Sequence, residues 1–161
     1  MIDAKQLYAF VITPVLGQLG LNSLAARRLV LGTAMTESAL IWLDQRDAGA
    51  PVLGPALGLW QMERLTHDDI WTNYLAYRKP LRAKVEGYVM PGVGRWEQLV
   101  GNLLYGCAMC RVHYQRRLGA MPDPDDLAAL ARAWKEHYNT VLGSGTVTDF
   151  MNKASTILAF N

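Results

Sequence analysis

One carboxylate stands alone in an apolar stretch of the chain. Residues 29–43 read LVLGTAMTESALIWL, and Glu37 is the only ionisable residue among them. On a helix, Val30, Ala34 and Ile41 would lie on its face. Apolar surroundings disfavour the charged form of a carboxyl group and raise its pKa, and an acid that stays protonated near neutral pH can give a proton to a glycosidic oxygen. Two other interpretations are a solvent-facing side chain at the helix edge and a structural pair with a buried arginine.

Further short blocks follow this acid along the chain. In order, the blocks are Glu37-Ser38, a Gly-rich loop of about twenty residues ending in GLWQM (58–62), then NLLYG (102–106) and HYNTVLGSGTV (137–147). In type, order and spacing they resemble the E-S, G-L-x-Q-M, N-I-x-x-G and A-Y-N-A-G segments of the lytic transglycosylase, or goose-type lysozyme-like, superfamily. The resemblance covers most of the chain from Leu29 to Val147.

The resemblance implies a catalytic role for Glu37. In this superfamily a single acid at the matching position protonates the bridging oxygen of the β-1,4 link between N-acetylmuramic acid (MurNAc) and N-acetylglucosamine (GlcNAc). In the transglycosylases the same carboxylate then takes a proton from the muramyl C6 hydroxyl, and that oxygen closes on C1. The product is a 1,6-anhydro sugar, and no water is consumed. The expected substrate is therefore the glycan strand of peptidoglycan.

Four other residues match positions near the acid in this superfamily, and Trp60 stands at the variable position of G-L-x-Q-M. Ser38 would face the cleft and Gln61 would line the sugar site. The Tyr138 hydroxyl would hold the acid in place, with Asn139 beside it, and Trp60 could stack on a sugar ring. Each residue also has a structural interpretation. Tyr138 continues an apolar helical stripe, Ser38 could fill space on a crowded helix, the two amides could cap local turns, and Trp60 could be a core side chain.

Two features leave alternatives open. The segment KEHYNTVLGSG around Tyr138 lacks the small residues that usually flank the Tyr-Asn pair, which also suits a phage virion or assembly protein that keeps the fold without catalysis. Asp44 and Asp47 lie in the loop after the acid. If either faced Glu37 across about 6.5–9.5 Å it could activate water, and the enzyme would be an inverting muramidase. The single-acid route is the favoured one.

The spacing C-x-x-C-x-x-H of Cys107, Cys110 and His113 could suggest a metal site. Both cysteines also belong to an apolar helical stripe, and no second ligand pair occurs elsewhere in the sequence. His67 and His137 have no partner at a ligand spacing. We therefore expect buried, inert thiols, no bound metal and no cofactor.

The composition limits the class of protein. Of 161 residues, 51% are hydrophobic and 19% are charged, with a formal net charge of +2. We expect one domain with a sizeable core, no nucleic-acid binding and no membrane insertion. The N-terminus does not have the pattern of a secretory signal. Because many members of the superfamily are made by phages, we expect a location in a phage virion, with other virion proteins as partners, or in the host cytoplasm before delivery to the cell wall.

Helical periodicity dominates the chain, and convincing strand alternation is not evident. We expect an all-α, lysozyme-like single domain over residues 1–161 with the Glu37 helix at its centre. The cleft would lie between the loop of residues 44–61 and the region of Tyr138. The predicted helices cover residues 4–19 with a bend near Pro14, 22 or 23 to 43, 67–78, 81–89, 96–114, the PDPDD segment to 139, and 147–160.

Overall fold

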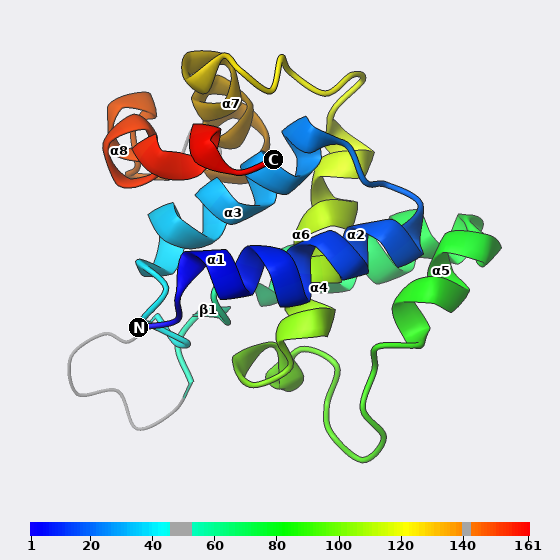
Figure 1. Ribbon diagram of the computed structural model, residues 1–161. Helices are drawn as coiled ribbons and strands as arrows, with labels where there is room; N and C mark the ends of the chain where they lie inside the picture. Colours follow the sequence, from blue (N-terminus) through cyan, green and yellow to red (C-terminus); the bar gives the residue numbers. More distant parts are fainter. Residues whose placement is uncertain (46–52, 140–142) are drawn as a thin grey trace.

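Helix α3 (Leu24–Ser38) lies in the middle of the molecule and carries Glu37 in its last turn (Figure 1). The computed structural model describes residues 1–45, 53–139 and 143–161. The Ser23 hydroxyl begins α3 by accepting a hydrogen bond from the Ala26 amide, at 3.1 Å. The helix is apolar on nearly all sides, and most of its residues are buried. Other elements must cover such a helix, which is why it forms the axis of the fold.

The elements around α3 are mostly helical, so the predicted all-α class is confirmed. Segments with π or 3₁₀ geometry are labelled η. In chain order the other elements are α1 (Ala4–Leu7), η1 (Tyr8–Ile12), α2 (Thr13–Leu19), β1 (Ala56–Leu57), β2 (Met62–Glu63), α4 (Arg64–Asp69), η2 (Ile70–Tyr74), η3 (Leu75–Tyr77), α5 (Lys79–Glu86), η4 (Glu97–Val100), α6 (Leu103–Arg117), α7 (Leu127–Trp134), η5 (Lys135–Asn139), α8 (Val147–Lys153) and η6 (Ser155–Ala159).

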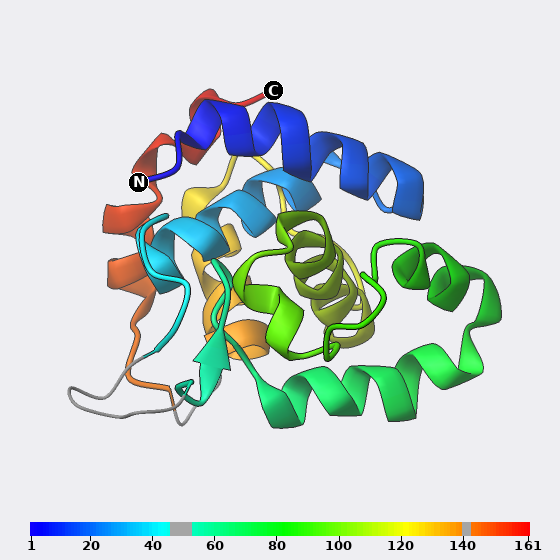
Figure 2. The ribbon, with the colours of Figure 1, turned by 90° about the horizontal axis from the view of Figure 1, so that it is seen from below.

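Helices from distant parts of the chain pack on the central helix. Contacts with α3 come from η1, α6, α7, α8 and η6. Figure 2 shows α6 almost end-on, between α3 and the helical run from α4 to η3. Within the described residues the buried apolar side chains form a core that extends from Leu7 to Ile157. No helix in this part of the chain is long and apolar enough to cross a membrane.

The first predicted helix is present as one helical run through α1, η1 and α2. Asp3 begins it by accepting a hydrogen bond from the Gln6 amide at 2.9 Å. Pro14 has no backbone N–H, and its ring crowds the carbonyl of the preceding turn. The run takes a π-helical turn over Tyr8–Ile12, just before the proline. Such a wider turn accommodates the missing hydrogen bond without ending the helix.

The second predicted helix is shorter than expected. The sequence predicts a helix to residue 43, whereas α3 ends at Ser38 because Ala39 and Leu40 have positive φ values of 50° and 56°. The Ser38 hydroxyl stabilises this end: it donates to a carbonyl of the preceding turn at 2.9 Å and accepts from the Leu40 amide at 3.2 Å. Glu37 is therefore near the C-terminal end of α3. Ile41, four positions later, lies beyond the helix and does not share a helical face with Glu37.

The helix predicted over residues 96–114 is interrupted. The 3₁₀ turn η4 comes first, and α6 begins only at Leu103, where the Asn102 side chain accepts a hydrogen bond from the Tyr105 amide at 3.0 Å. Both pieces pack against the same core, so the apolar stripe continues across the break and periodicity could not reveal it. The last predicted helix is divided in the same way, into α8 and η6.

A short antiparallel hairpin of β1 and β2 was not expected. Ala56 pairs with Glu63 across it. The turn needs glycine at position 58, where φ is 77° and a Cβ would lie 2.4 Å from the Leu99 carbonyl oxygen. Strands of two residues are too short for alternation to be visible in the sequence. The hairpin matters because it brings Glu63 to the wall of the cavity described below.

Hydrogen bonds from Arg28 link the C-terminal part of the chain to α3. Its side chain is buried and donates to the carbonyls of Pro124, Leu158 and Phe160 at 2.8–2.9 Å. It also donates to the Asp125 carboxylate at 2.6 Å. One set of contacts precedes α7 and the other follows α8. The arginine therefore holds both helices against the central one.

Arg28→Met should lower the free energy of unfolding by about 2–4 kcal/mol, because buried carbonyls lose their donors. Urea denaturation followed by circular dichroism measures the change. Arg117→Met, at an exposed position of α6, is the control and should change the free energy by less than about 0.5 kcal/mol. Equal stabilities of the two variants would contradict this role of Arg28.

Candidate active site

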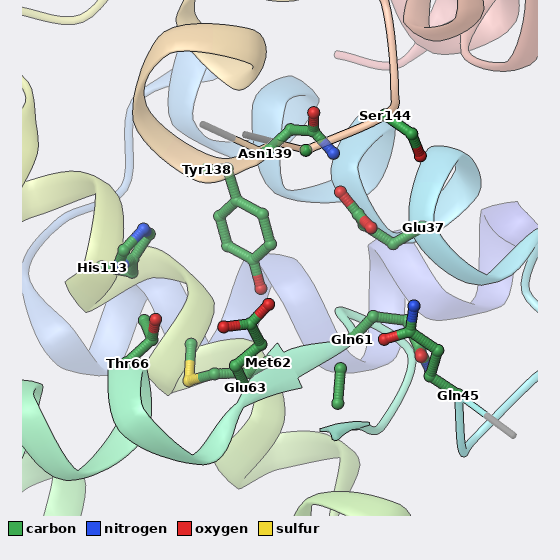
Figure 3. A pocket seen from close by; sticks show the side chains of 12 residues that line it. Glu37, Gln45, Gln61, Met62, Glu63, Thr66, His113, Tyr138, Asn139 and Ser144 are labelled. Carbon is green, nitrogen blue, oxygen red and sulfur yellow. The ribbon is translucent and has the colours of Figure 1, made fainter. Parts of the chain in front are cut away.

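Glu37 lies where two surface cavities meet. The polar cavity has a volume of about 270 Å³ and is shown in Figure 3, and the apolar cavity has a volume of about 670 Å³. Glu37, Gln45 and Gln61 line both cavities. The other residues that line the polar cavity are Ala56, Met62, Glu63, Thr66, His113, Tyr138, Asn139, Gly143 and Ser144.

The Glu37 carboxyl group is half-buried, and its pKa is raised from 4.5 to about 7. Desolvation is the largest cause of the raised pKa, and the charge of Glu63 acts in the same direction. Two groups oppose it: the Trp134 indole N–H donates to Oε1 at 2.8 Å, and the Lys153 ammonium attracts the carboxylate. The Lys153 ammonium donates to the Thr36 carbonyl at 3.2 Å. Near pH 7 the group can therefore both give and accept a proton.

Trp134, at the end of α7, is the residue that positions the acid. Its side chain is 1% exposed, and its ring lies against Phe150 with the centroids 5.6 Å apart. A Cβ at Gly145 would lie 2.6 Å from the indole, so glycine lets the chain pass close to the ring. This packing fixes the direction of the N–H. Trp134 is 97 residues from Glu37 in the chain and continues an apolar stripe, so no sequence signal marks it as a partner.

Tyr138 lines the polar cavity, but its hydroxyl does not have the predicted partner. It donates to the Trp60 carbonyl at 2.6 Å, whereas the donor to the acid is Trp134. The ring packs against His113 at 5.1 Å and Tyr114 at 5.4 Å between centroids. Figure 3 shows the Tyr138 side chain directed into the space between η5 and the hairpin. Tyr138 therefore forms part of the cavity wall, and its hydrogen bond links η5 to the turn of the hairpin.

Two predicted site residues have structural roles instead. Ser38 is 1% exposed, and its hydroxyl bonds to backbone groups at the end of α3, so it does not face the cleft. Trp60 is 2% exposed and donates from Nε1 to the Val30 carbonyl at 3.0 Å. Its ring packs against Gly106 of α6, where a Cβ would lie 3.1 Å away. Trp60 is therefore a core side chain, which excludes stacking on a sugar in this conformation.

The two predicted amides do line the polar cavity. Gln61 has a φ of 44°, in the left-handed region, and its Nε2 donates to the Gly58 carbonyl at 2.7 Å. Asn139 accepts from the Lys135 ammonium through Oδ1 at 2.8 Å. Each side chain thus supports its own turn while it remains at the cavity wall. This position suits hydrogen bonds with sugar hydroxyls, because an amide can both donate and accept.

The structure describes one of the two loop acids that the alternative mechanism could use. Asp44 lines the apolar cavity, and its Oδ1 accepts from the Gly54 amide at 2.7 Å, which ties the two ends of the loop together. Asp47 lies outside the described residues. Sequence reasoning missed Glu63, whose carboxylate points into the polar cavity below Tyr138 (Figure 3). The available signal was its place directly after the GLWQM block.

The cysteines and histidines do not suggest a metal centre. Cys107 and Cys110 are buried free thiols in α6, as predicted, and burial raises the pKa of both. His113 lies at 2.8 Å from the His137 carbonyl, and burial lowers its pKa to about 3. His67 bonds to the Tyr105 hydroxyl at 2.7 Å. Among the described residues, no group of three or more His, Cys, Asp or Glu side chains could hold a metal ion.

Comparisons of the chain with protein-family models, curated proteins and solved structures found no match. Membership of the transglycosylase superfamily therefore remains a prediction from the sequence blocks. A function has to be inferred from the site itself. That site combines one half-buried acid, an indole N–H that orients it, a facing carboxylate and two amides at the wall.

The raised pKa of Glu37 predicts a pH-dependent loss of stability. Below about pH 4.5 the group is protonated in both the folded and the unfolded chain. As the pH rises toward 7 the unfolded chain loses this proton first, so the folded state becomes less stable, and the loss is complete above about pH 7. Relative to the unchanged protein, Glu37→Gln should gain stability on the order of 3 kcal/mol between pH 4 and pH 8.

Urea denaturation at the two pH values measures this gain. Glu86→Gln, on the surface of α5, is the matched control and should show no comparable gain. If the stability difference between Glu37→Gln and the unchanged protein were the same at both pH values, the acid would not be desolvated in the folded protein.

Proposed function

We propose that this protein cleaves the β-1,4 link between MurNAc and GlcNAc in peptidoglycan, by lytic transglycosylation, with Glu37 as the catalytic acid. The observation that carries the proposal is the raised pKa, about 7, of a half-buried carboxyl group in the wall of a surface cavity. An acid of this kind is protonated in a large fraction of molecules at neutral pH, as proton donation to a glycosidic oxygen requires. The four sequence blocks that resemble the superfamily give independent support.

The contacts of Glu37 suggest how the steps would proceed. Oε1 is held by Trp134, which leaves Oε2 to give its proton to the bridging oxygen as the C1–O bond breaks. The resulting carboxylate is stabilised by the indole N–H and by Lys153. It then accepts the proton of the muramyl C6 hydroxyl while that oxygen bonds to C1. Glu37 is protonated again at the end, and the products are a free 4-hydroxyl and a 1,6-anhydro end.

A second route is favoured by one specific observation, the presence of Glu63 in the polar cavity. Its carboxylate raises the pKa of Glu37, so the two groups are close enough to interact. If Glu63 took a proton from water on the other side of the sugar, the reaction would be an inverting hydrolysis. Glu63 joins the predicted Asp44 and Asp47 as a candidate base of this route. Transglycosylation remains the first proposal because it needs only the acid whose pKa is tuned.

The setting of the activity rests on the resemblance alone. As in the sequence prediction, we propose delivery from a phage particle, or from the host cytoplasm, to the cell wall. The substrate is then a long anionic polymer, and no cofactor is needed for either route.

Glu37→Gln should reduce clearing of a peptidoglycan gel by about 10²-fold or more, because the amide cannot donate the proton. Glu86→Gln should clear the gel like the unchanged protein. Mass spectrometry of the released fragments distinguishes the routes, since an anhydro end is one water lighter than a hydrolysed end. Unreduced clearing by Glu37→Gln would remove this residue from the mechanism, and no clearing by the unchanged protein would favour an assembly role.

Trp134→Phe should shift the upper limb of the pH–activity profile to higher pH. The indole hydrogen bond lowers the pKa of Glu37, so its loss keeps the acid protonated further into the alkaline range. Trp71→Phe is the matched control, because the Trp71 N–H donates to the Tyr105 hydroxyl at 2.8 Å. A lower activity of Trp134→Phe with an unchanged pH limb would indicate that Trp134 only supports the fold.

A further inference from the structure

The apolar cavity is the larger hollow beside Glu37, and the proposed reaction gives it a role. A glycan strand that is cut at Glu37 must continue on both sides of the acid, because sugars lie on both sides of the bond that breaks. The polar and apolar cavities share Glu37, Gln45 and Gln61 and extend from them. The volume of the apolar cavity, about 670 Å³, lies in the range of small-molecule sites.

The wall of the apolar cavity is an exposed apolar surface. It contains Ile41, Trp42, Leu43, Leu53 and Val100, together with Asp44. The first four of these are 46%, 65%, 37% and 45% exposed. Apolar side chains that gather on a surface beside polar groups are a common sign of a binding site. Ile41, Trp42 and Leu43 closely follow the end of α3, so this part of the wall is connected to the helix of the candidate acid.

Trp42 differs from the other tryptophans in its exposure. Trp60, Trp71 and Trp134 are 2%, 8% and 1% exposed and Trp96 is half-buried, whereas Trp42 is 65% exposed. The Trp42 amide bonds to the Ser38 carbonyl at 3.1 Å, which holds the residue at the end of α3. The apolar surface of an indole exposed in this way is in contact with water, which is less favourable than contact with other apolar groups. A ligand with an apolar face would restore that contact.

We infer that Trp42 is a stacking platform for one saccharide ring, in the apolar cavity that adjoins the polar one at Glu37. The inference rests on the proposed function and names a subsite for its substrate. A β-1,4-linked pyranose has faces of axial C–H groups and a rim of hydroxyl and acetamido groups. The faces suit an indole surface. The rim suits Gln45, Gln61 and Asp44, which lie at the edge of the same cavity.

The test measures binding without turnover, in the Glu37→Gln protein, with a β-1,4-linked GlcNAc oligomer as the probe. Calorimetry should show that adding Trp42→Ala weakens binding by about tenfold, whereas Trp42→Phe keeps most of the affinity because it keeps an aromatic face. Phe10→Ala is the matched control: Phe10 is 73% exposed on η1 and lines neither cavity. It should leave the affinity unchanged.

A second measurement uses Trp42 without changing it. In the Glu37→Gln protein, the indole N–H signal of Trp42 should move on addition of the oligomer, and acrylamide should quench its fluorescence less. An unmoved Trp42 signal, or equal affinity of the Trp42→Ala and Phe10→Ala proteins, would overturn the subsite. Cleavage that depends on Glu37 would leave the proposed function intact in that case. Trp42-dependent binding without any cleavage would keep the subsite and refute the function.

Discussion

The rest of the site depends on one constraint: the Glu37 carboxyl group has to lose water and still keep a fixed direction. A desolvated carboxyl group has a raised pKa, and a buried polar group without a partner is costly. Burial meets the first condition and the Trp134 N–H meets the second. Because the indole is neutral, it orients the acid without the full charge of an arginine. The place of Glu37 at the C-terminal end of α3 also disfavours its charged form. The positive charge of Lys153 acts in the opposite direction and lowers the pKa of Glu37.

Elements far apart in the chain are needed to keep this arrangement. Trp134 is fixed by Phe150 and by a glycine that lets the chain pass close to it, and Arg28 binds the segments on either side of α7 and α8 to the central helix. On the opposite wall, the hairpin turn at Gly58 directs Glu63 into the polar cavity. The core therefore positions the acid, and the hairpin determines what faces it.

The sequence predicted what local patterns can encode. The helical class, the lone acid in an apolar segment and the buried cysteines of α6 followed from periodicity and composition. The end of α3 at Ser38 did not, because a positive φ at an alanine and a leucine has no signature in the sequence. Trp60 and Ser38 were assigned to the site from short blocks, but their burial depends on packing with residues far along the chain. Trp134 was missed for the same reason, since a core tryptophan and a tryptophan that orients an acid look alike in a helical stripe.

The most direct test of the central claim is the titration of the Glu37 side-chain carboxyl carbon by ¹³C NMR in the unchanged protein, with the signal assigned by its absence from Glu37→Gln. Desolvation in the wall of the cavity predicts a midpoint near pH 7. A midpoint near 4.5, the ordinary value of a hydrated glutamate, would contradict the claim and leave the protein without its candidate acid.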